Sequence, residues 1–317
     1  MLVLRRIWIS TTERTEGRIE TRIRPTVLGF LDGDIPGIRD LTRRDRGVFD
    51  RLLIRYSNQI SGSKLDSVSQ YFSSTHEIDR EIATLLSARR AWKRYLAAQR
   101  LGAINATVAG PALIVALRDK NFEVRRATVR SLGRLAVADA TAGLISALAE
   151  GRTPDSLTLW ALLQMGAPAL ETARAHLANG DDRMKIYAIR LVELLGSPRD
   201  SVAISTLVHD LSPGVRSAAA LALGRLGGAS SLTLLLELLE DEEGSVRRDA
   251  CKALGRLRDK TAIASLLLHA DTDEFDVAMA SSEALFATDP SILVDLDPGA
   301  ISSALMESRD LAFIERS

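Results

Sequence analysis

Apolar residues along this chain follow a repeating pattern. The sequence FEVRRATVRSLGRL at 122–135 returns as GVRSAAALALGRL, which ends at Leu226, and as SVRRDACKALGRL, which ends at Leu257. The Leu-Gly pairs of the last two copies are 31 residues apart, and the first gap of 91 residues is close to three such units. A fixed period of this length predicts stacked supersecondary units, so degenerate copies should lie between the clear ones.

Two columns of the repeat keep their chemistry in every copy. Stepping by 30 or 31 residues in both directions from Gly133 gives seven positions, and the residue before each is a branched aliphatic: Leu101, Leu132, Leu162, Val192, Leu223, Leu254 and Leu285. Four residues before each aliphatic stands a small residue: Ala97, Thr128, Thr158, Ala188, Ala219, Ala250 and Ser281. We expect the aliphatic column to fill the core and the small column to let backbones approach closely. The glycine is predicted to be dispensable, because Leu163, Glu193 and Phe286 occupy its column.

A second apolar stretch follows each copy after a short break. These stretches cover 109–117, 142–148, 169–177, 202–211, 232–239 and 263–268. Each unit is therefore predicted to be two helices of roughly 12 residues joined by a turn, and such a pair must stack to bury its faces. The predicted fold is an all-α, right-handed α-solenoid of about seven helical pairs with a helical N-terminal cap.

The repeat has the pattern of a known family. The segments VRRATVRSLGRL, VRSAAALALGRLG and VRRDACKALGRLRD share Val-Arg, paired small residues and Leu-Gly in the same order. They resemble HEAT repeats of the short type called phycobilisome-lyase HEAT-like repeats, over about residues 91–290. The resemblance implies a fold rather than a function, since this repeat is a general scaffold. The layout is also similar to that of bacterial HEAT-repeat proteins with an N-terminal membrane anchor.

The first 90 residues are helical in pattern but lack the repeat. The opening MLVLRRIWIS is too short to span a membrane. An apolar start followed by arginines is typical of the cytosolic end of a membrane helix, so Arg5, Arg6 and Trp8 are candidate membrane-proximal residues. An ordinary amphipathic helix explains the same residues equally well. Pro25 is expected at or near a helix start, where proline is tolerated.

We divide the chain into four parts. Residues 1–31 form an N-terminal helix, 32–90 a helical cap, 91–290 the repeat array and 291–317 a C-terminal helical cap. Within the N-terminal cap, Thr42 is expected to begin one helix, with further helices over 65–72 and 77–89. The caps would cover apolar end faces of the array that otherwise meet water.

Composition adds a compartment and a charge gradient. The single cysteine, Cys251, leaves no internal disulfide and favours a reducing, cytoplasmic compartment. The net charge is zero, but residues 1–100 hold 19 basic and 12 acidic residues, whereas the remainder holds 22 basic and 29 acidic. The acidic array argues against nucleic acid as a partner. A basic N-terminal part is compatible with association at the inner face of a membrane.

Arginines recur near the start of the first helix of a unit. They stand in the Val-Arg pairs at Arg125, Arg216 and Arg247, and each follows a carboxylate, at Asp119, Asp210 and Asp241 respectively. At this spacing an arginine can reach a turn carboxylate of its own or a neighbouring repeat. We therefore predict a structural inter-repeat ladder rather than a binding site.

Catalytic and metal-binding patterns are missing from the sequence. The four histidines are scattered, and His76-Glu77 lacks the further His-Glu pairs that HEAT-like di-iron hydroxylases use. His209 precedes Asp210 at a predicted helix end, where an imidazole can bond carbonyl groups. Cys251 is predicted to be a buried thiol that acts as a small apolar group. We predict no catalytic residue, no metal and no cofactor.

The expected function is that of a non-enzymatic scaffold. It would bind a protein partner along a concave row of second helices, at the cytoplasmic face of a membrane if the N-terminal resemblance holds. Trp160, Tyr187 and Phe275 are unusual in an array that is poor in aromatics, and, if exposed, they are the first candidate partner contacts. Packing between repeats is the alternative role for these three. The alternative function is a bilin lyase or isomerase subunit, which the family resemblance implies.

Overall fold

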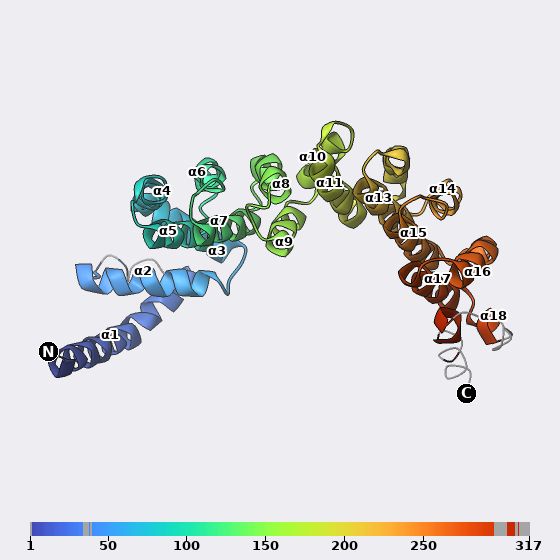
Figure 1. The fold of residues 1–317 in the computed structure, drawn as a ribbon. Coiled ribbons are helices and arrows are strands. Elements are labelled where there is room, and N and C mark those ends of the chain that lie inside the picture. The colour runs from blue at the N-terminus through green and yellow to red at the C-terminus, as the bar shows by residue number, and fades with distance from the viewer. Residues whose placement is uncertain (1, 34–37, 39, 295–302, 308–309, 311–317) are drawn as a thin grey trace. The chain divides into compact units, whose positions relative to one another are not determined.

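The protein is built from helices throughout the part of the chain that the structure describes. This computed structural model describes residues 2–33, 38, 40–294, 303–307 and 310, with side chains described from residue 17 onward. No strand occurs in those ranges. The chain divides into two compact units, one of residues 1–147 and 152–164 and one of residues 148–151 and 165–317. Each unit stacks helical pairs (Figure 1), and the predicted all-α solenoid is confirmed.

The chain opens with one long helix, α1, at Leu2–Leu31. Ile19, Ile23 and Val27 are buried and spaced by four residues, so they form one face, which packs on the following helix. Pro25 lies inside α1, and its prediction as a helix start was wrong. It is exposed, so the backbone group that loses its hydrogen bond can turn to water. Among the described residues, no helix has both the length and the apolar character needed to cross a membrane.

Three helices follow and match their predictions closely. They are α2 (Arg43–Ser57), α3 (Ser63–Ser74) and α4 (Glu77–Ser87). The Thr42 hydroxyl accepts a hydrogen bond from the backbone N–H of Asp45 at 3.2 Å, which caps α2 as expected. Phe30, Phe49 and Tyr71 meet edge to face with ring centroids 5.5 to 5.8 Å apart. This cluster joins α1, α2 and α3 in one small core.

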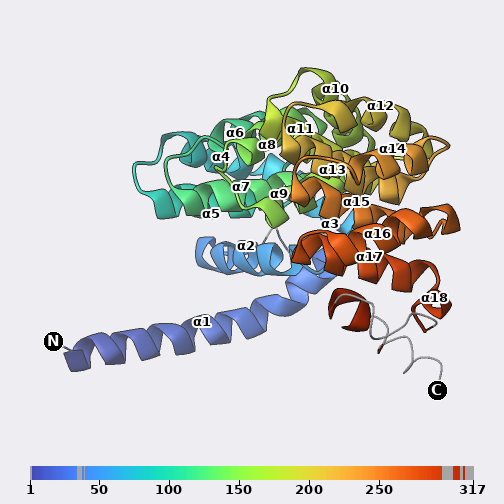
Figure 2. The same ribbon diagram turned by 45° about the vertical axis from the view of Figure 1, so that its right-hand side comes forward.

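The repeat array alternates two rows of helices, which form separate layers within each unit (Figure 2). The first helices are α5 (Ala91–Ala103), α7 (Phe122–Leu135), α9 (Asp155–Met165), α11 (Asp182–Leu195), α13 (Pro213–Leu226), α15 (Gly244–Leu257) and α17 (Phe275–Thr288). The second helices are α6 (Gly110–Ala116), α8 (Thr141–Ala149), α10 (Ala167–Asn179), α12 (Ser201–Ser205), α14 (Ser231–Leu238), α16 (Ile263–Thr272) and α18 (Pro290–Val294).

One second helix departs from its predicted length. The stretch 202–211 was expected to be continuous, but α12 ends at Ser205 and a 3₁₀ turn runs over Thr206–His209. The hydroxyl of Ser205 donates to the carbonyl of Val202 at 2.7 Å, and that of Thr206 to the carbonyl of Ala203 at 3.0 Å. Such side-chain bonds compete with the α-helical backbone pattern and tighten it locally.

Both repeat columns lie in the core. All seven aliphatic residues and all seven small residues named above are at most 1% exposed. The aliphatic residues therefore fill the space between layers, as predicted. Ser131, next to this core, donates from its hydroxyl to the Ala98 carbonyl at 2.7 Å and so joins α7 to α5.

The glycine column corrects a prediction, because glycine is not dispensable where it occurs. A Cβ atom at Gly224 would lie 2.6 Å from the Cα of Ala253, and one at Gly255 would lie 2.9 Å from the Cα of Ala284. These distances are far inside van der Waals contact, and the atoms belong to the backbone of the next first helix. Copies with a larger residue, such as Phe286, must therefore pack their neighbouring helix differently.

Candidate functional site

The predicted arginines form contacts between consecutive repeats. The guanidinium of Arg216 on α13 donates to both carboxylate oxygens of Asp241, from Nε at 2.7 Å and from Nη2 at 2.8 Å. Arg247 on α15 donates to Asp273 in the same way, at 2.8 and 2.7 Å. Each aspartate lies in the turn before the first helix of the next repeat. We call this series the inter-repeat ladder.

Each arginine of the ladder also holds its own turn. Nη1 of Arg216 donates to the carbonyl of Asp210 at 3.0 Å, and Nη1 of Arg247 to the carbonyl of Asp241 at 2.8 Å. The Asp241 carboxylate in turn accepts the backbone N–H of Glu243 at 3.0 Å. One arginine therefore fixes two successive turns, and this geometry uses most of its donors within the fold.

Further members of the ladder lie outside the predicted set. Arg94 makes a bidentate contact with Asp119 at 2.6 and 2.9 Å, and Lys185 donates to Asp210 at 2.8 Å. Stepping back 31 residues from Arg125 and from Arg216 reaches these two positions, so the period itself was the signal. Arg125 differs from the rest, because its Nε donates at 2.7 Å to the backbone carbonyl of Arg152, not to a carboxylate.

Charge pairing sets the ionisation of the ladder aspartates. The hydrogen bonds from Arg247 lower the pKa of Asp273 to about 2, although burial opposes them. For Asp241, burial alone would raise the pKa, but the bonds from Arg216 and from a backbone N–H outweigh it and lower the pKa. These carboxylates are therefore ionised and paired at neutral pH, which suits a structural role better than acid–base chemistry.

The three predicted partner contacts all lie on first helices. Trp160 on α9 is 38% exposed, and Phe275 at the start of α17 is 66% exposed. Tyr187 on α11 is buried and 8% exposed, so its ring packs inside the array. The two exposed aromatics belong to different units. Their row is not the row of second helices along which the sequence placed the partner.

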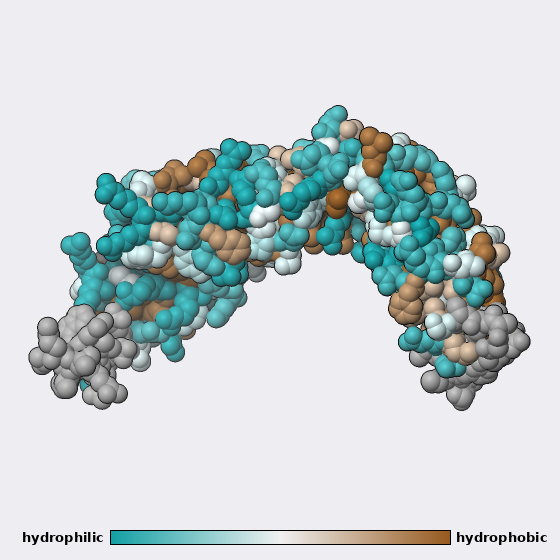
Figure 3. All heavy atoms as spheres, viewed as in Figure 1, coloured by the Kyte–Doolittle hydropathy of each residue, from teal (hydrophilic) through white to brown (hydrophobic). Residues whose placement is uncertain are grey.

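Two exposed aromatic residues escaped the sequence analysis. Trp92 near the start of α5 is 54% exposed, and Phe122 at the start of α7 is 46% exposed. The guanidinium of Arg125 lies 5.6 Å from the Phe122 ring centroid. Figure 3 shows a mainly hydrophilic face with separate hydrophobic patches, so exposed apolar groups are discrete. An aromatic residue at the first turn of a first helix would have been the signal.

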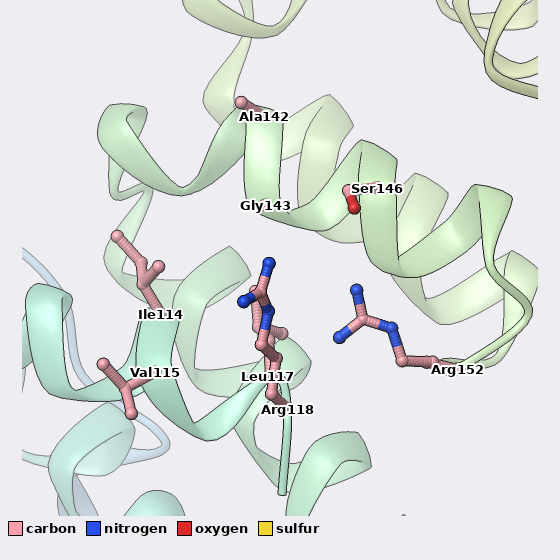
Figure 4. Close-up of a pocket in the computed structure, with 8 residues that line it drawn as sticks. All are labelled: Ile114, Val115, Leu117, Arg118, Ala142, Gly143, Ser146 and Arg152. Atoms are coloured by element: carbon pink, nitrogen blue, oxygen red, sulfur yellow. The ribbon is translucent and has the colours of Figure 1, made fainter. Parts of the chain in front are cut away.

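A pocket of about 490 Å³ opens between α6 and α8 in the first unit. Its apolar wall comes from Ile114, Val115 and Leu117, and α8 contributes Ala142, Gly143 and Ser146. Arg118, which follows α6, and Arg152, in the loop after α8, turn their guanidinium groups toward each other across the opening (Figure 4). The sequence analysis singled out none of these residues.

Groups with nucleophilic or metal-binding chemistry are occupied in packing. Cys251 is fully buried, and burial raises the pKa of its thiol to about 11. His269 is buried, and its Nδ1 lies 3.0 Å from Asp273 of the ladder. Within the described part of the chain, no three His, Cys, Asp or Glu residues are grouped as metal ligands would be.

The candidate membrane-proximal residues Arg5, Arg6 and Trp8 lie within α1, but their side chains fall outside the described residues. The predicted C-terminal cap over 291–317 is described only in part, through α18 and residues 303–307 and 310. Both assignments therefore stay predictions.

Paired helices, a buried small-aliphatic pattern and a ladder between turns define an α-helical repeat protein. The chain belongs to the HEAT-repeat family: the family pattern matches residues 79–164 and 201–285, just over half of the chain. No curated protein matches the sequence significantly.

Several solved structures share the fold at low sequence identity. The CpcE–CpcF complex of phycocyanin lyase from Nostoc sp. PCC7120 is 23% identical, with 75% of this chain and 94% of that chain covered and a TM-score of 0.34. Human deoxyhypusine hydroxylase in complex with glycerol is 17% identical, with 86% and 97% covered and a TM-score of 0.35. YibA of Escherichia coli is 18% identical, with 81% and 99% covered and a TM-score of 0.42. These likenesses show the fold alone.

Proposed function

We propose that this HEAT-repeat chain is a non-enzymatic scaffold that binds a protein partner. The observation that carries the proposal is a division of labour between residue classes. The residues common to all repeats are buried in the core, and the ladder is bonded within the fold. Residues that differ between repeats, such as Trp160 and Phe275, keep large apolar surfaces exposed. Exposed aromatic residues on a rigid frame are the usual anchors of protein interfaces.

The proposal places the partner on the row of first helices. Trp92, Phe122 and Trp160 expose aromatic rings on three first helices of one unit. Aromatic rings bury a large area with little loss of side-chain entropy, which favours them as contact points. The surface between them is mainly polar, so the partner would contact several separate anchors.

Localisation is a further part of the proposal. We place the protein in the cytoplasm because its single cysteine is buried and its fold needs no disulfide. Association with the inner face of a membrane would involve the Leu2–Trp8 end of α1. An in-frame apolar segment upstream of Met1 in the gene is the expected observation, and a stop codon directly upstream would remove this part of the proposal.

Partner capture from native extract tests the scaffold function. The whole chain would be purified from native membranes and cytosol, and co-purifying proteins would be identified by mass spectrometry. Trp160→Ala and Phe275→Ala should reduce recovery of the partner at least tenfold, whereas Leu211→Ala, at a 98% exposed position, should not. If no protein is enriched above background, or if both aromatic variants behave like the wild type, the proposal fails.

The bilin lyase alternative requires its own experiment. The chain would be co-expressed with a phycobiliprotein and a bilin, alone and with a second subunit. A scaffold yields no covalent adduct, whereas an adduct that depends on this chain would replace the proposed function with the alternative.

A further inference from the structure

We propose that the pocket between α6 and α8 binds a partner segment in which a carboxylate lies beside a branched aliphatic side chain. The inference concerns the chemistry of a partner and rests on the scaffold function in that sense. It involves the row of second helices in the first unit, not the aromatic residues of the first helices. The two proposals can therefore fail independently.

Charge is the first argument for this ligand. The eight described residues that line the pocket include Arg118 and Arg152 and no acidic residue. Their guanidinium groups point toward one another over the opening (Figure 4). Two like charges held close together repel, and a bound anion would turn that repulsion into two attractive contacts. Planar guanidinium groups match carboxylate oxygens in geometry, and the Ser146 hydroxyl offers a further donor.

The apolar wall is the second argument. Ile114, Val115 and Leu117 line the side formed by α6 and its end, and Val115 is 63% exposed although it is apolar. A volume of about 490 Å³ lies within the usual range of roughly 300 to 1,000 Å³ for ligand pockets. An inorganic anion would leave this wall in water, whereas an aliphatic side chain next to the carboxylate would cover it.

Gly143 is the third argument, because it keeps the pocket open. A Cβ atom there would meet Leu117 Cδ1 at 3.4 Å and Ile114 Cγ2 at 3.8 Å, which is ordinary contact. An alanine would therefore be tolerated in place of the glycine, while a leucine would extend into the pocket and fill it. This pair of substitutions separates loss of the cavity from loss of the fold.

Peptide binding to the purified chain tests the inference. The probe is acetyl-Gly-Ser-Leu-Leu with a free C-terminal carboxylate, and its matched control is the same peptide with a C-terminal amide. Isothermal titration calorimetry and backbone amide NMR shifts at Gly143 and Ser146 would report binding. We expect the free acid to bind at least tenfold more tightly than the amide, and we expect added salt to weaken it.

Variants locate the site. Arg118→Glu should weaken binding of the free acid at least tenfold, since Arg118 is exposed and its charge is reversed. Arg126→Glu reverses a partly exposed arginine outside the pocket and should leave affinity unchanged. Gly143→Leu should abolish binding, whereas Gly143→Ala should retain it. Arg152 is a poorer choice, because it has further interactions within the fold. Circular dichroism would check that each variant is folded.

Several outcomes would overturn the inference. They are absence of binding at free-acid concentrations up to about 10 mM, a range that covers weak affinities, equal affinity for acid and amide, and unchanged affinity in Arg118→Glu. Inorganic phosphate that binds as tightly as the peptide would show a simple anion site and would also overturn it. Loss of the aromatic-dependent partner described above would leave this result untouched, because the peptide experiment uses no partner protein.

Discussion

The guanidinium of Arg216 donates two hydrogen bonds to the carboxylate of Asp241, and these two residues belong to consecutive repeats. Their side chains are only 10% and 9% exposed. The pair thus connects α13 to the turn before α15 and acts as a cross-brace that adds to apolar packing. Removal of one member would leave the other charged and poorly solvated.

Loss of Arg216 should therefore destabilise the second unit. We expect Arg216→Met to lower the free energy of unfolding by about 2 to 4 kcal/mol, because Asp241 would remain charged without its partner. Arg126→Met is the matched control, since the Arg126–Glu123 pair is 42% and 49% exposed. That change should cost less than about 1 kcal/mol. Urea unfolding followed by circular dichroism at 222 nm measures both, and equal losses would contradict a bracing role for the ladder.

Acid should weaken the same part of the fold. The pKa of Asp273 is lowered to about 2 in the folded chain by Arg247, from 3.8 without such contacts. Its contribution is thus complete above pH 4 and is lost as the pH falls toward 2, when the carboxylate must take up a proton. This linkage amounts to about 2 kcal/mol for Asp273 alone. Asp273→Asn should be less stable at pH 7 and should lose less stability than the wild type between pH 5 and 2. A steeper loss in the variant would show that other groups control acid unfolding.

The glycine column should be intolerant of even one methyl group. Gly224→Ala places a Cβ atom 2.6 Å from the Cα of Ala253, so α13 and α15 must separate. We expect a loss of about 1 to 3 kcal/mol despite the better helix propensity of alanine. Gly47→Ala is the control, since a methyl group added at this position of α2 would meet no atom within 4 Å. It should gain up to about 1 kcal/mol. Thermal unfolding compares the two, and a stabilised Gly224→Ala would refute close backbone packing.

Cys251 should be unreactive in the folded chain. Its thiol is fully buried, and burial raises its pKa to about 11. At pH 8 only on the order of one thiol in a thousand is ionised, and the sulfur is also inaccessible to reagents. Labelling with iodoacetamide should therefore be slow in native buffer and complete within minutes in 8 M urea, roughly as for a free thiol. Fast labelling of the native chain would mean that the second unit opens readily or that the thiol is functional.

The sequence by itself determined the stacking of this protein. A period of about 31 residues, an aliphatic residue at positions such as Leu223 and a small residue at positions such as Ala219 were enough to predict paired helices and their buried faces. The reason is that each unit buries the same face against its neighbour, so the same chemical demand returns at every step. The ladder was predictable for the same reason, and the period also points to Arg94 and Lys185.

Tertiary structure decided everything that does not repeat. Whether Tyr187 is buried and Phe275 is exposed depends on which neighbour covers each ring, and the two look alike in sequence. Gly224 reads as replaceable until the Ala253 backbone is found beside it. The α6–α8 pocket joins Arg118 and Arg152 across a helix and two turns, with no pattern along the chain to link them. A repeating sequence fixes the contacts that every repeat shares, whereas a surface arises from the differences between repeats and from residues that only the folded chain brings together.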